Sequence, residues 1–231
     1  MIEVKKLVKR FGSKTILRGV DFHVEPGEFV ALLGPNGAGK TTFLRILATL
    51  SRPSMGIVSV AGFALPAQSA AVRLRLGVVS HMPLLYGDLT AGENLQFYGR
   101  MYHVPKLNGR VSEVLEMVGL SARRNDLVRT FSRGMQQRLA IGRAVLHDPD
   151  VMLFDEPYTG LDQDASGMLD TVLKEVAARR RTVVMTSHDL ARAEDLASRF
   201  DILSRGVIAA SASRADLGKD NLLTFYKQAL V

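Results

Sequence analysis

A short glycine-rich segment carries the residue types that bind a polyphosphate. Residues 34–41 read Gly-Pro-Asn-Gly-Ala-Gly-Lys-Thr, which fits the pattern G-x-x-x-x-G-K-[ST]. Glycines leave backbone N–H groups open to phosphate oxygens because they have no Cβ, and a following helix N-terminus adds partial positive charge. We expect Lys40 to reach the β- and γ-phosphates of a nucleotide and the Thr41 hydroxyl to ligate Mg²⁺. The expected binding residues of this segment are Gly34, Pro35, Asn36, Gly37, Ala38, Gly39, Lys40, Thr41 and Thr42.

The flanking residues predict a strand before this segment and a helix after it. Residues 29–33 are all apolar, and the apolar residues of 43–47 follow with helical spacing. The alternative is a glycine turn that precedes a helix by chance. Because the strand and the helix that the phosphate-binding motif requires are both present, the sequence favours the nucleotide site.

Two carboxylates follow a second apolar strand. Residues 151–154 are apolar and lead directly into Asp155 and Glu156. In a parallel sheet, catalytic groups lie at the carboxyl ends of the strands. We therefore expect Asp155 to hold Mg²⁺ opposite Thr41, and Glu156 to polarise an attacking water. The alternative is a strand end that carries two solvated acids; the lysine and threonine upstream favour the catalytic interpretation.

A histidine and a phenylalanine are further candidates, and the residues leave both open. His188 follows the predicted strand 182–187, where it would hydrogen-bond a γ-phosphate or serve a structural role. Phe11 lies between predicted antiparallel strands in the sequence Lys-Arg-Phe-Gly. An exposed aromatic ring there would stack on an adenine, whereas a packed ring would only fill the hairpin.

Composition limits the classes of protein that need to be considered. A length of 231 residues predicts one α/β domain. The absence of cysteine excludes disulfides and thiolate metal sites and is consistent with a reducing compartment. Neither a signal-peptide core nor an apolar run of about 18 residues is present, so we expect a cytosolic chain without a membrane span.

The net charge of +7 raises the question of nucleic-acid binding. The basic residues are dispersed, however, and their densest groups are short, as in 123–124 and 179–181. This pattern favours a solvated surface over a nucleic-acid or anionic-lipid footprint, and no nucleic-acid partner is expected.

The remaining sequence predicts how these segments are connected. Residues 1–30 read as short antiparallel strands, 57–62 and 76–80 as further strands, and 202–208 as a closing hairpin. Residues 90–147 have a helical texture, with apolar residues at 111, 114, 115 and 118. We predict one domain, 1–231, with a helical subdomain of about 90–147 inserted in its core. An amphipathic helix around Met168 and a short helix at 221–231 complete the prediction.

Five motifs in this order and spacing resemble ATP-binding cassette (ABC) ATPases over essentially the whole chain. They are the glycine-rich segment, Phe-Ser-Arg-Gly-Met-Gln-Gln-Arg at 131–138, Leu-Phe-Asp-Glu-Pro at 153–157, Gly-Leu-Asp at 160–162 and Ser-His-Asp at 187–189. The resemblance implies a P-loop NTPase fold with a RecA-like, mostly parallel core sheet. It also implies an N-terminal antiparallel β subdomain and an inserted α-helical subdomain.

The resemblance further implies a mechanism with ATP and Mg²⁺ as cofactors. Two copies would dimerise head to tail, so that each ATP lies between the glycine-rich segment of one copy and Ser132 and Gly134 of the other. By this mapping Phe11 stacks on adenine, Asp162 communicates across the dimer and His188 acts as a switch. Integral membrane permease subunits would be the partners, which places the chain at the cytoplasmic face of the cell membrane.

Two departures from the usual family pattern are visible. The segment 131–138 corresponds to the signature motif of the family, which usually resembles L-S-G-G-Q. In this chain Arg133 replaces one glycine of the signature, and Met135 replaces its glutamine. His81 stands where the family usually has a glutamine that contacts Mg²⁺ and water and connects to the permease. Because histidine titrates near neutrality, coupling to the permease is predicted to depend on pH.

Segments 80–83, 89–95 and 131–138 resemble the haem-exporter ATPases of cytochrome c maturation. Exporters of drugs, lipids or polysaccharides share many of these sequence features and remain the alternative.

Two other functional classes are less consistent with the sequence. A soluble ABC ATPase of DNA repair or translation would carry a long coiled coil or a second cassette, which 231 residues do not accommodate. A scaffold without turnover would not need Lys40, Asp155, Glu156 and His188 together.

Overall fold

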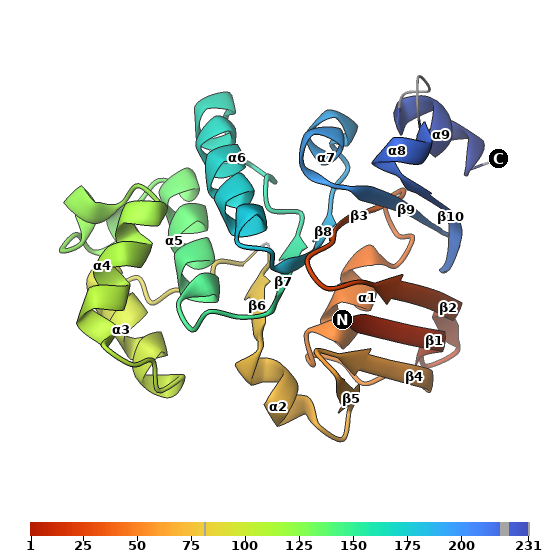
Figure 1. Ribbon diagram of the computed structural model, residues 1–231, viewed down its shortest axis with the longest axis horizontal. Coiled ribbons are helices and arrows are strands. Elements are labelled where there is room, and N and C mark those ends of the chain that lie inside the picture. Colours follow the sequence, from red (N-terminus) through yellow and green to blue (C-terminus); the bar gives the residue numbers. More distant parts are fainter. Residues whose placement is uncertain (81, 218–221, 231) are drawn as a thin grey trace.

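The computed structural model describes residues 1–80, 82–217 and 222–230, and these residues form two sheets with helices packed on and between them (Figure 1). A four-stranded antiparallel sheet has the order β2-β1-β4-β5. A six-stranded sheet has the order β10-β9-β3-β8-β7-β6, in which only the β10-β9 pair is antiparallel. The expected fold class, with a mostly parallel core sheet and an N-terminal antiparallel sheet, is confirmed.

The antiparallel sheet comes from strands whose residues alternate between the core and solvent. In β2, for example, Leu17, Val20, Phe22 and Val24 are buried, while the intervening positions are mostly exposed. The strands of this sheet are β1 (Ile2–Phe11), β2 (Lys14–Val24), β4 (Met55–Val60) and β5 (Phe63–Leu65).

The core sheet instead contains strands that are buried on both faces. Every residue of β3, β7 and β8 is buried, which explains why these strands are apolar except for Asp155, Thr182 and Thr186 at the strand ends. Along β3, Phe29, Ala31 and Leu33 belong to one hydrophobic cluster and Val30 and Leu32 to another. The strands of this sheet are β3 (Phe29–Leu33), β6 (Leu76–Val79), β7 (Val151–Asp155), β8 (Thr182–Thr186), β9 (Arg199–Ser204) and β10 (Val207–Ser213).

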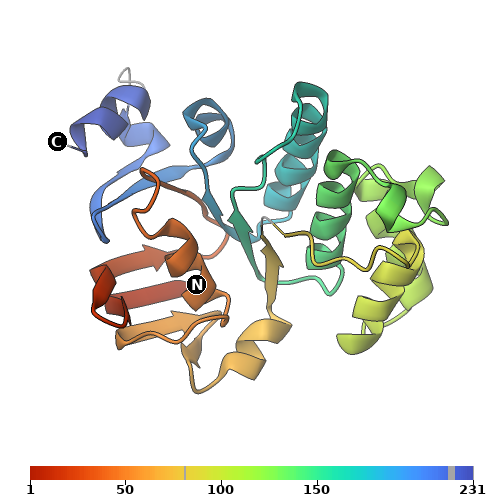
Figure 2. The same cartoon turned by 180° about the vertical axis from the view of Figure 1, so that it is seen from behind.

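Helices cover the two faces of the core sheet. Helix α1 packs between the two sheets through Phe43, Ile46 and Leu47, whereas α5, α6 and α7 stand side by side on the opposite face (Figures 1 and 2). The helices are α1 (Lys40–Leu47), α2 (Ser69–Leu74), α3 (Ala91–Met101), α4 (Leu107–Met117), α5 (Arg133–Val145), α6 (Gln163–Ala178), α7 (Leu190–Leu196), α8 (Arg214–Leu217) and α9 (Leu222–Gln228), with 3₁₀ turns η1 (Ser121–Arg123) and η2 (Val128–Thr130).

The region predicted to be a helical subdomain contains α3, α4 and α5, which lie at one end of the molecule (Figure 1). Helix α3 begins with a reciprocal capping box between Thr90 and Glu93. The apolar residues with helical spacing lie on α4, where Val111, Val114 and Leu115 are buried in the core. These three helices pack on one another; their status as a separate subdomain stays a prediction.

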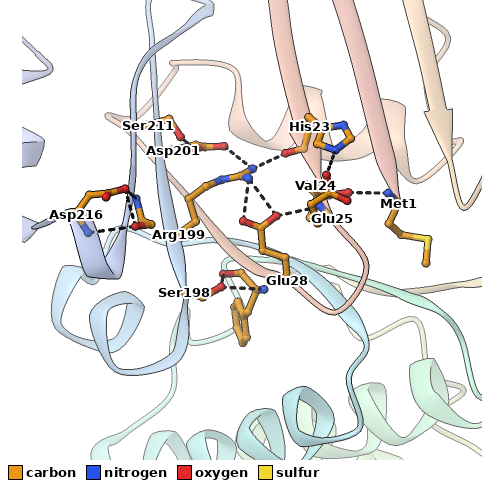
Figure 3. A network of polar contacts seen from close by, with 12 residues as sticks. Met1, His23, Val24, Glu25, Glu28, Ser198, Arg199, Asp201, Ser211 and Asp216 are labelled. Atoms are coloured by element: carbon orange, nitrogen blue, oxygen red, sulfur yellow. Dashed lines mark hydrogen bonds and ion pairs between the residues drawn. The ribbon is translucent and has the colours of Figure 1, made fainter.

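An ionic network joins the antiparallel sheet to the last two strands (Figure 3). The Arg199 guanidinium, on β9, contacts both oxygens of Glu28 at 2.8 and 3.0 Å and also donates to the carbonyl oxygen of His23. Asp201 lies 3.2 Å from Arg199 and accepts a hydrogen bond from the Ser211 hydroxyl. Burial raises the pKa of Asp201 despite these partners. Because a buried charge that loses its partner is costly, this network fixes how the two sheets meet.

Among the described residues, no helix combines the length and the apolar character that crossing a bilayer would require.

His147 follows α5 and stacks on Tyr102, with ring centroids 3.9 Å apart and an interplanar angle of 8°. Burial lowers the pKa of His147 to about 4, and the nearby charges of Arg181 and Arg110 act in the same direction. The folded state therefore binds this proton less readily than the unfolded chain does. The contribution of the neutral His147 ring to the free energy of unfolding is fully present at pH values above 6.5, its pKa in the unfolded chain. This contribution is lost as pH falls toward the pKa in the folded chain.

We expect the free energy of unfolding to fall between about pH 7.5 and about pH 5 by about 2 kcal/mol more in the wild type than in His147→Phe. Phenylalanine keeps the stacking on Tyr102 but cannot titrate, and all other groups are shared by the two proteins. Urea unfolding at both pH values measures the difference. Equal pH dependence in the two proteins would show that His147 is not held neutral by the fold.

Candidate functional site

The glycine-rich loop leaves the end of β3 and enters α1 at Lys40. Gly34 has φ +148, and a Cβ there would lie 2.1 Å from the carbonyl oxygen of Leu203. Gly34 is thus required by the close approach of β9, a packing reason that the sequence pattern does not reveal. At Gly37, by contrast, a Cβ would meet no atom within 4 Å, so this part of the loop is open.

Lys40 is a buried cation at the first position of α1. Its Nζ donates to the carbonyl oxygens of Gly34 and Pro35 at 2.7 and 3.2 Å and lies 3.9 Å from Glu156 Oε1. Burial lowers the pKa of Lys40, while the charges of Glu156 and Asp155 oppose this effect. The ammonium is therefore held inside the loop by backbone oxygens, in a place where a phosphate would be a stronger partner.

Thr41 and Asp155 lie together, as the sequence predicted. The Thr41 hydroxyl donates to Asp155 Oδ1 at 3.1 Å, and the Thr186 hydroxyl donates to the same oxygen at 3.0 Å. Asp155 ends β7 and is buried, so its carboxylate has a fixed position between α1 and β8. Hydroxyl and carboxylate oxygens are ligands that Mg²⁺ prefers.

Glu156 and His188 form a second pair beside this one. Glu156 has φ +51, in the left-handed region, and its N–H donates to the Thr186 hydroxyl at 3.0 Å. Its carboxylate oxygen Oε2 lies 2.7 Å from Nδ1 of His188, whose side chain is 66% exposed. A strained backbone at a candidate catalytic residue is a common feature of functional sites. The exposure of His188 argues against a purely structural role for its ring.

Lys40, Thr41, Glu156 and His188 line one cavity of about 620 Å³, and Asp155 contacts its lining through Thr41. It extends from the glycine-rich loop to the Glu156–His188 pair, and Lys14, Ile16 and Thr159 add to its wall. No sequence motif pointed to these three residues. Lys14 and Ile16 belong to the start of β2 and carry no motif, so the only available signal was their place just after Phe11 in the hairpin. The full lining is Lys14, Ile16, Pro35, Asn36, Gly37, Ala38, Gly39, Lys40, Thr41, Thr42, Glu156, Thr159 and His188.

The cavity fits a nucleoside triphosphate with Mg²⁺. The loop offers backbone N–H groups, Lys40 offers an ammonium, and Thr41 with Asp155 offers two hard oxygen ligands. Among residues 1–80, 82–217 and 222–230 there is no cluster of three or more His, Cys, Asp or Glu side chains that could hold a metal. Phosphate oxygens and water would complete the Mg²⁺ coordination, as is usual for Mg²⁺ at phosphate sites.

Among the described candidates, Phe11, Ser132 and Gly134 do not line this cavity. Phe11 ends β1 and is 55% exposed as a residue, and Lys9 Nζ lies 4.6 Å from its ring centre. The ring is thus not packed inside the hairpin. Ser132 and Gly134 begin α5, where the Ser132 hydroxyl accepts from the N–H of Met135 at 3.3 Å. The predictions for His81, as a catalytic residue and Mg²⁺ contact, fall on a residue outside the described part of the chain.

The signature segment contacts the loop that contains Asp162. A Cβ on Gly160 would lie 2.6 Å from Cζ of Arg133, so the guanidinium of this unusual signature residue rests directly on the glycine. Asp162 accepts from the N–H of Ala165 at 2.8 Å and caps α6. A Cβ on Gly134 would lie 2.6 Å from the Cβ of Ala165. The starts of α5 and α6 therefore touch at two small residues, Gly134 and Ala165. A larger side chain at Gly134 would force the two helices apart.

A Gly134→Ala substitution is expected to destabilise the protein by about 1–3 kcal/mol, because it overpacks this contact. Ala165→Gly in the same chain should restore at least half of the loss by making room for the new methyl group. Urea unfolding of the two single variants and the double variant measures the coupling. Additive losses in the double variant would mean that Gly134 is not constrained by α6.

Comparisons with known proteins agree with this geometry. The family model described as ABC transporter matches residues 17–159. The linearmycin resistance ATP-binding protein LnrL of Bacillus subtilis is 38% identical over 220 residues, which are 94% of this chain and 70% of that protein. The Nod factor export ATP-binding protein I of Paraburkholderia xenovorans is 39% identical over 207 residues, 89% of this chain and 68% of that protein.

Solved structures show the same arrangement. An ATP-binding subunit of an ABC transporter superposes with a TM-score of 0.90 at 30% identity and covers 99% of both chains. A dimeric ATP-binding cassette in a post-hydrolysis state, bound to ADP and Pi, superposes with a TM-score of 0.84 at 27% identity, over 93% of this chain and 99% of that one. On the family match, these relatives and the architecture, the chain belongs to the ABC transporter family, as an ATP-binding subunit.

Proposed function

We propose that this chain hydrolyses ATP in a dimer of two copies and thereby powers an exporter in the cell membrane. The observation that carries the proposal is the meeting of Lys40, Thr41, Asp155, Glu156 and His188 around one cavity or in direct contact with its lining. In this proposal the P-loop backbone and Lys40 hold the phosphates, and Thr41 and Asp155 hold Mg²⁺. Bound Mg²⁺ supplies charge neutralisation at the β- and γ-phosphates.

Glu156 is proposed to orient the attacking water. Its carboxylate lies between the Lys40 ammonium and the His188 ring, so it has one oxygen near each. His188 would then be free to contact the γ-phosphate when Glu156 turns toward water. Ser132 and Gly134 of the second copy would add donors to the γ-phosphate from the N-terminus of α5. Phe11 is proposed to stack on the adenine, and Asp162 to contact the facing copy.

The dimer is proposed because a related cassette is dimeric in its structure with ADP and Pi. In this chain Ser132 is exposed at the N-cap of α5, and neither Ser132 nor Gly134 lines the cavity of its own chain, so this helix N-terminus would be available to a second copy. Binding of ATP would close the dimer, and hydrolysis would release it.

A membrane subunit is proposed as the second partner. Large apolar side chains remain exposed around a cavity of about 200 Å³ between the core and the helices α3 and α5. Leu84, at 53% exposed, lines this cavity, and Tyr86 and Phe97 lie in ring contact beside it. An apolar patch of this kind marks a protein interface. Such docking would place the chain at the cytoplasmic face of the cell membrane.

The cargo belongs to this proposal too. One relative is named for linearmycin resistance and another for Nod factor export, which favours an exporter of drugs, lipids or polysaccharides for this chain. Haem export is the narrower candidate and rests on the resemblance of residues 80–83, 89–95 and 131–138 to the haem-exporter ATPases.

Two measurements test the proposal. The purified chain should release phosphate from ATP with Mg²⁺ and lose this activity with EDTA; no ATP binding would overturn the function. Tagged protein carrying Glu156→Gln, purified from native membranes with ATP, should bring a permease with it. A haem absorbance band in that complex would support haem export, and a permease without haem would support the other exporters. Nucleic acid or ribosomes without a membrane protein would overturn transport.

A further inference from the structure

Arg192 lies in the first turn of α7 and contacts groups from three separate segments. Its guanidinium pairs with Asp170 on α6 and lies 3.2 Å from Oδ2 of Asp189, the N-cap of α7. Its Cζ also lies 4.8 Å from the centre of the Tyr158 ring, in a cation–π arrangement. One side chain thus joins the loop after β7, helix α6 and the loop after β8.

Asp170 completes the connection from the other side. Its Oδ1 accepts a hydrogen bond from the Tyr158 hydroxyl at 2.6 Å, while its Oδ2 pairs with Arg192. Burial and this hydrogen bond raise the pKa of Tyr158, so the phenol stays protonated and donates at every physiological pH. The side chains of Arg192 and Asp170 are 25% and 28% exposed, so their pairing is less screened than that of a surface ion pair.

The two loops joined in this way are those that the proposed mechanism uses. Tyr158 lies two residues after Glu156, in the loop that ends at the α6 cap, Asp162. Asp189 follows His188 directly, and its N–H donates a hydrogen bond to the Ser187 hydroxyl at 3.0 Å. Both loops line one further cavity of about 470 Å³ that adjoins the nucleotide cavity through Glu156, Thr159 and His188.

We propose that Arg192 is a positioning residue that couples the 158–162 loop to the placement of His188, by way of Asp170 and Asp189. The inference rests on the proposed ATPase function. The His188 side chain is 66% exposed and is paired with Glu156. The position of its ring therefore depends on the backbone of 187–189, which Arg192 holds through Asp189. A facing copy that moves the 158–162 loop moves Tyr158, and the movement reaches His188 through this connection.

The mildest substitution is Tyr158→Phe, which removes only the hydrogen bond to Asp170 and keeps the aromatic ring beside the Arg192 guanidinium. Its single-turnover rate at saturating ATP and Mg²⁺ is expected to fall by about 3- to 10-fold, the range for one hydrogen bond, with ATP affinity unchanged. Arg192→Ala should lose more, and Arg192→Lys should lie between, since lysine pairs with one carboxylate but cannot bridge two.

The decisive measurement repeats Tyr158→Phe and Arg192→Ala in a His188→Ala background. If both act through His188, each should change the remaining rate by less than about 2-fold there, because the group that they position is gone. A connection that only holds α6 to α7 would cost the same factor in both backgrounds and would overturn the proposal. Should Arg192→Ala fail to fold, the Tyr158→Phe pair carries the test alone.

The matched control is Arg75→Ala. Arg75 also pairs with an aspartate, Asp150 at 2.9 Å, but at the amino ends of the parallel strands and therefore away from the nucleotide cavity. It should leave the rate unchanged in both backgrounds. A wild-type chain without hydrolysis would refute the proposed function, whereas wild-type hydrolysis with multiplicative losses would refute only the role of Arg192.

Discussion

A Glu156→Gln variant is expected to bind ATP and to lose turnover by about 100-fold or more, the range that a positioned general base contributes. Glutamine has nearly the same shape and keeps an oxygen near Lys40, so the loop and the cavity should be preserved. It carries no charge, however, and does not polarise water as a carboxylate does. Phosphate release and equilibrium ATP binding, measured on the same preparation, separate these two effects.

The same variant should accumulate as an ATP-bound dimer, visible by size-exclusion chromatography with ATP and absent with ADP. The matched control is Glu175→Gln, which changes a partly exposed glutamate on α6 that is paired with Arg179. This control should hydrolyse ATP at the wild-type rate. Turnover of Glu156→Gln within a few-fold of the wild type would show that another group serves as the base.

Replacing Lys40 with alanine is expected to weaken ATP binding by about 100-fold or more. A charged hydrogen bond contributes about 1.5–3 kcal/mol, and Lys40 is the buried cation of the loop. Its removal also leaves the carbonyl oxygens of Gly34 and Pro35 without this donor. The glycine-rich loop would therefore lose both its positive charge and the hydrogen bonds that hold its backbone in place.

Isothermal titration with ATP and Mg²⁺ measures the loss for Lys40→Ala. Lys174→Ala, an exposed lysine on α6, serves as the control for general loss of positive charge and should bind ATP as the wild type does. An affinity within about 3-fold of the wild type in Lys40→Ala would contradict the proposed phosphate contact, since it corresponds to less than about 0.7 kcal/mol.

The sequence predicted best those parts of the fold that are buried on both faces. Strands β3, β7 and β8 have apolar centres, and each is followed within two residues by a candidate site residue: Gly34 after β3, Glu156 after β7 and His188 after β8. The start of α6 was harder to predict, because its first turn, Gln163 and Asp164, is exposed and polar. The pattern around Met168 therefore indicated only the middle of this helix, and its true beginning at Gln163 is set by the Asp162 cap.

For the candidate site, motif spacing indicated Lys40, Thr41, Asp155, Glu156 and His188, which the structure places close together. Their catalytic roles stay predictions. Contacts between side chains that are distant in sequence could not be predicted, because no spacing rule relates them. Tyr158, Asp170 and Arg192 come from three elements, and Arg133 meets Gly160 only because α5 packs against α6.

The order of strands in the core sheet has a consequence for synthesis of the chain. Phe29 of β3 pairs with Val183, and Ala31 pairs with Phe200, so both neighbours of this strand are made after most of the protein. At usual translation rates of about 5–20 residues per second, the apolar strand that carries the nucleotide loop waits about 10–30 seconds for its partners. An unpaired apolar strand promotes aggregation, so the nascent chain should need protection by a chaperone until residue 200 has left the ribosome.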